Sequence, residues 1–211
     1  MRRRTRNFLP RRLTKKRSNF RPEAASANTG GPLRSPVVVG LGNPGRSYEL
    51  TRHNVGFLVA DELARRYGGV WRKKKKSDAA DISLGASSAT LLKPRTFMNN
   101  SGAAVGGHRV KDLIVVHDDL DLPVGDVRVK VGGGAGGHNG LRSLIGQLGN
   151  EFVRVRIGVG RPSEHMTVTD HVLGKMDAAV KDAVPTAADA VEAVIEAGAE
   201  AAMNRFNVRS E

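Results

Sequence analysis

Short apolar runs alternate with amphipathic stretches along most of this chain, and their spacing predicts strands interleaved with helices. Apolar runs rich in β-branched residues, or apolar residues alternating with basic ones, are typical of strands. Apolar residues at helical spacing, bounded by glycines, indicate helices. The expected strands are residues 37–39, 82–84, 90–92, 113–116, 127–131 and 153–159. The expected helices are residues 53–67, 101–108, 141–148 and 176–203, the last one bent near Pro185 and Gly198.

This order predicts the α/β class, with a largely parallel or mixed sheet. A length of 211 residues suits one domain of ordinary size. No apolar run is long enough for a membrane span, and no secretory signal is visible. The chain has no cysteine, which excludes disulfides and thiolate metal sites and suits a reducing compartment.

The net charge of +13 lies mostly at the N-terminus. Residues 1–34 hold eleven Lys or Arg and one acid, which gives +10 and leaves +3 for the other 177 residues. Proline and glycine punctuate this segment, so we expect residues 1–34 to form a disordered basic extension and residues 35–211 to form the folded domain. Three interpretations of the extension stay open: an arm that binds nucleic acid, an organelle transit peptide, or a start of the reading frame without function.

The loop Gly40–Gly45 follows the first expected strand and has the spacing of a dinucleotide-binding fingerprint. That fingerprint needs a helix to open at the loop, whereas Pro44 lies inside it and the helix is expected only from His53. The glycines are better explained as a sharp turn that presents Asn43. Its amide could orient a water or a substrate, or could merely stabilise the turn.

His53 and Asp118 form the candidate catalytic pair. An imidazole titrates near neutral pH and is the usual general base, although a single histidine at a helix start is more often structural. Asp118 is expected just beyond the end of a buried strand, where open α/β sheets place their sites. An aspartate there can fix the tautomer of a histidine. The alternatives are a solvated acidic turn or a metal site, but the acids around Asp118 lack a regular metal-binding spacing.

Two further loops are candidates for contacts with a ligand. Gly132–Gly137 holds five glycines and one alanine, and it could cradle a phosphate or admit a polymer backbone, although no Gly-Lys-Ser/Thr follows. In the loop over residues 93–102, Phe97 and Met98 could form an apolar wall beside Asn99.

Taken together, five motifs resemble bacterial peptidyl-tRNA hydrolase in order and approximate spacing. They are Gly-Leu-Gly-Asn-Pro-Gly (40–45), Tyr48 with Thr-Arg-His-Asn (51–54), Thr-Phe-Met-Asn (96–99), His-Asp with Asp-Leu-Pro (117–118 and 121–123), and Gly-Gly-His-Asn-Gly (136–140). The resemblance covers about residues 36–207 and leaves out the basic extension.

The resemblance implies a single domain with a mixed twisted sheet surrounded by helices. It implies hydrolysis of the ester that joins a peptide to the 3′ end of tRNA, which recycles tRNA from prematurely released peptidyl-tRNA during translation. It implies no metal and no organic cofactor, and we expect a cytoplasmic monomer with no membrane partner. A catalytically inactive RNA-binding factor of the same fold is the alternative.

The resemblance also implies roles for individual residues. His53 resembles the general base that activates water, Asp118 its stabilising partner, and Asn43 the residue that reads the substrate beside the scissile bond. The expected contacts to the tRNA end or the peptide are Tyr48, Phe97, Asn99 and Asn139, with Met98 as a pocket wall. Positive side chains must also meet the RNA phosphates. The candidates are Lys130, Arg154 and Arg156, of which we favour Lys130 and Arg156.

Three features depart from the family's pattern. Ala135 stands where a polar residue is common, so any hydrogen bond made there is absent. The stretch over residues 71–76 is unusually basic, and the long basic extension is unusual too.

Overall fold

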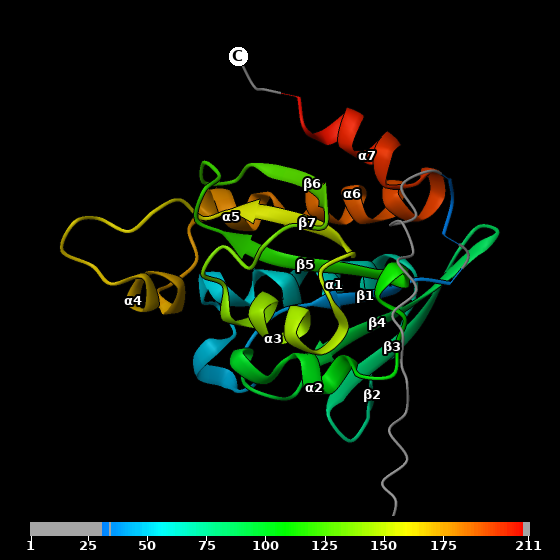
Figure 1. Cartoon of the computed structure of the whole chain (residues 1–211), viewed down its shortest axis with the longest axis horizontal. Coiled ribbons are helices and arrows are strands. Elements are labelled where there is room, and N and C mark those ends of the chain that lie inside the picture. The colour runs from blue at the N-terminus through cyan, green and yellow to red at the C-terminus, as the bar shows by residue number, and fades with distance from the viewer. Residues whose placement is uncertain (1–30, 34, 209–211) are drawn as a thin grey trace, which may run out of the picture.

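A seven-stranded sheet forms the centre of the protein, in the strand order β2-β3-β4-β1-β5-β7-β6 (Figure 1). The computed structural model describes residues 31–33 and 35–208. The strands are β1 (Val37–Gly40), β2 (Arg72–Lys73), β3 (Ser77–Leu84), β4 (Ser87–Pro94), β5 (Leu113–Asp119), β6 (Val127–Val131) and β7 (Val153–Gly158).

The sheet is mixed, as predicted. The strands β4, β1, β5 and β7 run parallel to one another, while β2, β3 and β6 pair antiparallel to their neighbours. Because the four parallel strands share one direction, their carboxyl ends and the loops that follow lie along one edge of the sheet, where α/β proteins place their sites.

Helices cover both faces of the sheet. They are α1 (Val55–Arg66), α2 (Gly102–Val105), α3 (Asn139–Leu148), α4 (Val168–Leu173), α5 (Ala178–Asp182), α6 (Val184–Ala197) and α7 (Ala199–Phe206), with short 3-10 turns η1 (Arg46–Tyr48), η2 (Arg52–Asn54), η3 (Met98–Asn100) and η4 (Val110–Asp112). In Figure 1, α2 and α3 lie in front of the sheet, and α1 and α6 lie behind it. A hydrophobic core lies on each face of the sheet, and alternate residues of a strand point into one core or the other. Val38 and Ile114 pack with α1 and α6, whereas Val39 and Val115 pack with α3.

Two glycines let β1 and α1 approach closely. A Cβ at Gly40 would lie 2.2 Å from the carbonyl oxygen of Gly56, and one at Gly42 would lie 2.7 Å from the ring of Phe57. These glycines therefore serve the contact between strand and helix. The geometry gives them a role that needs no dinucleotide.

The structure corrects several expected boundaries. Strand β5 continues through Asp119, so Asp118 lies within the strand and pairs with Ile157. The expected helix over residues 176–203 is three helices: Pro185 lies in the first turn of α6, and Gly198, with φ 90°, separates α6 from α7. Helix α4 was not expected at all, since its six residues are half apolar and half polar and are too few to show a helical spacing.

Leu33, just before the expected start of the domain at residue 35, also packs into the core: its side chain is buried, and its N–H donates to the Ile195 carbonyl (2.9 Å). Residues 1–30 and 34 lie outside the described residues, so the interpretations of the basic extension remain predictions. Within the described residues, no helix is both long and apolar enough to cross a bilayer.

Candidate active site

The two side chains that the sequence analysis paired are in contact at the carboxyl edge of the sheet. His53 belongs to η2, which connects β1 to α1, and Asp118 belongs to β5. The Nδ1 atom of His53 lies 2.9 Å from Oδ1 and 3.0 Å from Oδ2 of Asp118. Only 10% of the His53 side chain and 2% of the Asp118 side chain are exposed. The pair is therefore enclosed, with the imidazole nearer to solvent.

The hydrogen bonds define the tautomer of His53. Burial opposes ionisation of Asp118, but the facing His53 and His138 outweigh it and hold the pKa of this carboxyl well below its ordinary value. An ionised carboxylate can only accept hydrogen bonds. Nδ1 of His53 therefore carries the proton, and Nε2, which has no partner among the described residues, keeps its lone pair.

A second histidine donates to the same carboxylate. His138 caps α3, where its Nδ1 accepts from the main-chain N–H groups of Gly140 (3.1 Å) and Leu141 (3.3 Å). Its Nε2 must therefore carry the proton, and it donates to Oδ1 of Asp118 at 3.0 Å. The helix cap thus aims His138 at Asp118, and the two imidazole rings lie 4.7 Å apart, centre to centre.

The glycine loop, Gly132–Gly137, brings His138 to this position. Because β6 is antiparallel to β7, the chain leaves β6 at the edge of the sheet opposite to Asp118 and must return along its face. Gly132, Gly133, Gly136 and Gly137 have positive φ values between 54° and 100°, which glycine adopts readily. The unusual composition of the loop therefore has a backbone explanation.

His53, Asp118 and His138 are the one cluster in the described part of the chain that could hold a metal ion. Their hydrogen bonds oppose this use. A metal would need the lone pair of His138 Nε2, yet Nδ1 of that ring already accepts two main-chain N–H groups, so Nε2 carries the only ring proton. The hydrogen bonds therefore favour protonated ring nitrogens facing Asp118 over a bound metal ion.

His117 is a poor candidate for the base. Its Nδ1–H donates to the main-chain oxygen of Asp118 (2.7 Å). Burial, followed by the neighbouring His138, lowers the pKa of His117 to about 3, which keeps it neutral. Its Nε2 is buried and has no hydrogen-bond partner in the described structure. Only His53 combines the carboxylate partner with an available ring nitrogen.

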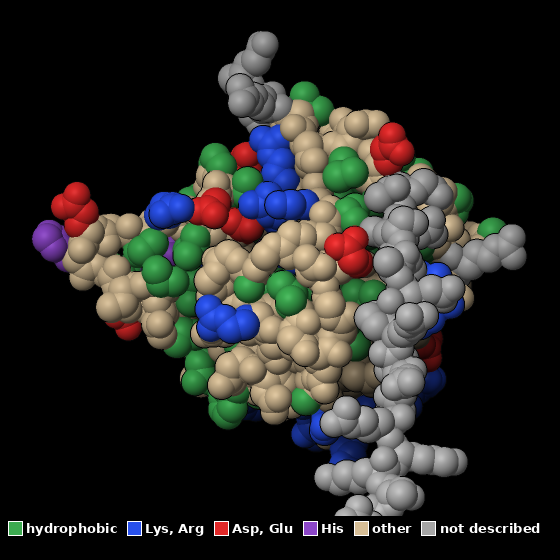
Figure 2. Space-filling model, viewed as in Figure 1, with side chains coloured by type: hydrophobic (Ala, Val, Ile, Leu, Met, Phe, Trp, Pro, Cys, Tyr) green, Lys and Arg blue, Asp and Glu red, His purple; other side chains and the backbone are tan. Residues whose placement is uncertain are grey.

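A cavity of about 330 Å³ opens beside His53 and Asp118. It is lined by the glycine loop, the acidic turn after β5, α4 and the strands β6 and β7. The cations Lys130, Arg154 and Arg156 all contribute to its wall. Over the region of β6 and β7, Figure 2 shows Lys and Arg side chains interspersed with acidic ones.

The three cations differ in how far they are neutralised. Arg156 is paired with Asp119 at 2.7 Å, so its charge is largely compensated. Arg154 is only 4% exposed and donates to the carbonyls of Gly133 and Gly134. Lys130 is exposed, and it lies with Arg154 around Gly133: a Cβ there would sit 3.2 Å from Lys130 Cε and 4.0 Å from Arg154 Cζ. Lys130 is thus an exposed cation with no carboxylate partner among the described residues, whereas the guanidinium of Arg154 is buried and occupied by main-chain carbonyls. The assignment of Lys130 and Arg156 to the phosphate contact stays a prediction.

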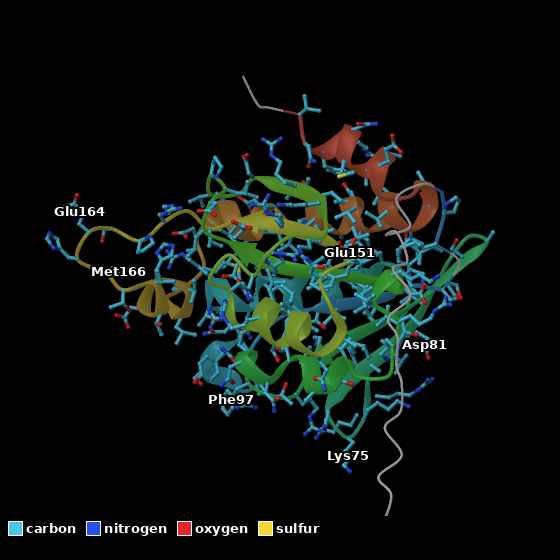
Figure 3. All side chains as sticks on the ribbon, in the orientation of Figure 1. Lys75, Asp81, Phe97, Glu151, Glu164 and Met166 are labelled. Carbon is cyan, nitrogen blue, oxygen red and sulfur yellow. The ribbon has the colours of Figure 1, made fainter. Side chains whose placement is uncertain are left out.

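Arg52, the residue before His53, ties the segment around α4 to the site. Its guanidinium donates to the carboxylate of Asp177 at 2.8 and 3.1 Å and to the main-chain oxygen of His171 at 3.0 Å. Residues Val168, Thr169 and Val172 of α4 line the cavity. The loop before α4 projects from the body, with Glu164 and Met166 near its tip (Figure 3).

Asn43 is linked to the site by a set of hydrogen bonds. Its main-chain N–H and C=O pair with Oδ1 (2.8 Å) and Nδ2 (2.9 Å) of Asn54, the residue after His53. Its Oδ1 accepts from the main-chain N–H of Met98 at 2.8 Å. The sulfur of Met98 lies 2.5 Å from where a Cβ of Gly140 would be, beside His138. Asn43 itself lines a second cavity of about 550 Å³ on the side of α1.

The remaining predicted contacts lie around these residues. Tyr48 and Phe97 form an edge-to-face pair with ring centres 6.3 Å apart, and Phe97 is 59% exposed (Figure 3). Asn99 is exposed in η3. Asn139 lines the first cavity, and its Oδ1 accepts from Arg142 (2.8 Å).

Sequence reasoning assigned no role to His138 or Asn54, although both stand in the motifs that it quoted. An imidazole directly before a helix was the available signal for His138. Asn54 gave no signal, since its partner Asn43 is eleven residues away.

Comparisons with known proteins agree with this geometry. A family model described as peptidyl-tRNA hydrolase matches residues 37–211. A relative from Rubrobacter xylanophilus with that name is 66% identical over 172 residues, which span 82% of this chain and 100% of the relative. One from Anaeromyxobacter dehalogenans is 48% identical over 186 residues, covering 82% and 97%. The crystal structure of the Acinetobacter baumannii peptidyl-tRNA hydrolase is 34% identical, with a TM-score of 0.76 and coverage of 85% and 97%. This chain belongs to the peptidyl-tRNA hydrolase family.

Proposed function

We propose that this chain hydrolyses the ester between peptide and tRNA with a water activated by His53. The observation that carries the proposal is the available Nε2 of His53, opposite an Nδ1–H held by Asp118 at 2.9 Å. An imidazole in this tautomer can take a proton at Nε2, and the carboxylate stabilises the imidazolium that results.

The reaction then needs no covalent bond between enzyme and substrate. As His53 Nε2 removes a proton from water, the water oxygen attacks the ester carbonyl and a tetrahedral oxyanion forms. When this collapses, the bond to the ribose oxygen breaks, and that oxygen takes the proton back from His53. The products are tRNA with a free hydroxyl and a peptide with a free carboxyl group.

Amide groups are the proposed donors to the oxyanion or to the substrate beside it. The N–H of Met98 donates to Oδ1 of Asn43, which identifies Nδ2 as the amide nitrogen, and Nδ2 has no acceptor among the described residues. Asn139 offers a second amide at the first cavity. Such fixed donors stabilise developing negative charge. Tyr48, Phe97, Met98 and Asn99 surround them as contacts for peptide or nucleotide.

We propose that the mechanism needs no metal, and purified protein tests this. With EDTA and spermidine, the second to keep tRNA folded, the 22.6 kDa chain should release tRNA from N-acetyl-phenylalanyl-tRNA at an unchanged rate. The free aminoacyl ester, phenylalanyl-tRNA, is the matched control and should be cleaved far more slowly. If Zn²⁺ or Mn²⁺ but not spermidine restored a lost activity, the metal-free mechanism would be wrong.

We propose Lys130, together with Arg156 in the same cavity wall, as the site of phosphate contact. Replacing the exposed Lys130 by Ala should weaken tRNA binding and lower the slope of log K against log salt by about 1. At saturating substrate, kcat should stay close to its original value. Lys181→Ala, an exposed lysine of α5 outside the cavity, is the control. An unchanged slope in the Lys130 variant would remove this residue from the RNA contact.

An inactive RNA-binding factor of the same fold is disfavoured by the intact contact between His53 and Asp118. We propose that the enzyme acts in the cytoplasm on prematurely released peptidyl-tRNA. We also expect a monomer, because the contacts of His53 and His138 with Asp118 need no residue of a second chain. The elution volume of the purified protein checks the last point.

A further inference from the structure

We propose that Asn54 is a positioning residue that holds Asn43 in the orientation needed for the reaction. The inference rests on the proposed role of Asn43 beside the scissile ester. Asn54 is 2% exposed, and its amide makes two short hydrogen bonds, both to the main chain of Asn43.

The directions of these bonds follow from the backbone. The N–H of Asn43 can only donate and its C=O can only accept, so Oδ1 of Asn54 faces the first and Nδ2 faces the second. The side chain of Asn54 thus pairs with Asn43 as a neighbouring strand would. Since Asn54 is buried, the second N–H and the second lone pair of its amide are out of reach of a substrate.

The direction of a hydrogen bond also shows which end of the Asn43 side-chain amide is the oxygen and which is the nitrogen. Because the N–H of Met98 must donate, it fixes Oδ1 of Asn43 as the acceptor at 2.8 Å, and Nδ2 becomes the donor that remains. Asn54 therefore sets the backbone of Asn43, and Met98 sets its side chain. Both are needed to keep a donating amide in place.

This arrangement closes a ring of contacts around the reacting groups. Asn54 follows His53 directly in the chain, so the residue that holds Asn43 and the general base both lie in one turn, η2. On the other side, Met98 packs against Gly140, whose N–H is held by His138. A shift of Asn43 relative to His53 would have to break the pair with Asn54. The role of Asn54 is thus to fix the distance between the donor and the base.

A double-mutant cycle on N-acetyl-phenylalanyl-tRNA tests the inference. We expect Asn43→Ala and Asn54→Ala each to lower kcat/KM by about 10–100-fold, and Asn54→Ala to cost less than about threefold once Asn43 is already Ala. The Kd for deacylated tRNA should not change. Asn54→Asp, which keeps the size but turns an oxygen toward the Asn43 carbonyl, should behave like Asn54→Ala and serves if the alanine variant fails to fold.

Asn207→Ala is the matched control, since Asn207 makes the same two bonds, each 2.8 Å, to the main chain of Val129, and neither residue lines either cavity. It should leave kcat/KM unchanged. Asn54 variants within twofold of the original kcat/KM, or effects of Asn43→Ala and Asn54→Ala that multiply, would overturn the positioning role. A harmless Asn43→Ala would remove the role of Asn43 and that of Asn54 with it. Failure of the unaltered chain to cleave this ester would instead reject the proposed function itself.

Discussion

Replacing His53 by Ala should lower kcat for N-acetyl-phenylalanyl-tRNA by about 10²–10⁴-fold, the range that a general base contributes. The reason is geometric: Nε2 of His53 is the available imidazole nitrogen beside an ionised carboxylate, whereas the free nitrogen of His117 is buried. Single-turnover kinetics with saturating enzyme measures the chemical step directly. Tight binding of deacylated tRNA should persist, because the cations of the cavity wall are untouched.

A second substitution separates catalysis from structure at this position. Asn in place of His53 can still donate to Asp118 from nearly the place of Nδ1, but it offers nothing at the place of Nε2. We therefore expect His53→Asn to be as inactive as His53→Ala while melting closer to the unaltered chain. His108→Ala, an exposed histidine after α2, should retain full activity. A His53→Asn variant with most of its rate would mean that His53 serves only to hold Asp118.

The spacing of apolar residues predicted the strands and helices whose buried side chains follow that spacing. β1, β5 and β7 were expected because their apolar residues are continuous or alternate, and α1 and α3 because theirs recur at helical spacing. Helix α4 escaped because it is fixed by a tertiary contact: Arg52 reaches the His171 carbonyl across 119 residues of sequence. The spacing of apolar residues within a segment cannot show a partner that lies so far away in the sequence.

The candidate site likewise has one part that the sequence predicted and another part that depends on the three-dimensional structure. Residue types and the order of the motifs predicted that His53 pairs with Asp118, because an aspartate can fix the tautomer of a histidine that acts as a base. The role of His138 depended on two facts that only coordinates hold, the return of the glycine loop along the sheet face and the cap that orients the ring. The sequence likewise did not show that Arg156 pairs with Asp119 or that main-chain carbonyls occupy the buried guanidinium of Arg154, and the assignment of Arg156 to the phosphate contact stays a prediction.

Replacing Asp118 by Asn should lower kcat by about 10²–10⁴-fold, and Asp118→Ala should be the milder change, at about 10–10²-fold. Oδ1 of Asp118 accepts from both His53 and His138, and Oδ2 is 3.0 Å from His53. An amide at this place would turn an N–H toward His53 Nδ1. The ring would then accept there and carry its proton on Nε2, which removes the base. Alanine imposes no tautomer, so a fraction of the correct form survives.

The pH–rate profile distinguishes this orienting effect from a charge effect. Because the facing histidines hold the pKa of Asp118 well below its ordinary value, the carboxylate stays ionised throughout the acid limb, which then reports protonation of the base rather than of Asp118. The negative charge favours the imidazolium, so its removal in Asp118→Ala should move the limb of kcat/KM to lower pH. A limb that stays in place, with Asp118→Asn still slower than Asp118→Ala, would mean that Asp118 orients His53 without stabilising its charge. The reverse order of the two variants would contradict the tautomer argument and leave charge as the main contribution of this carboxylate.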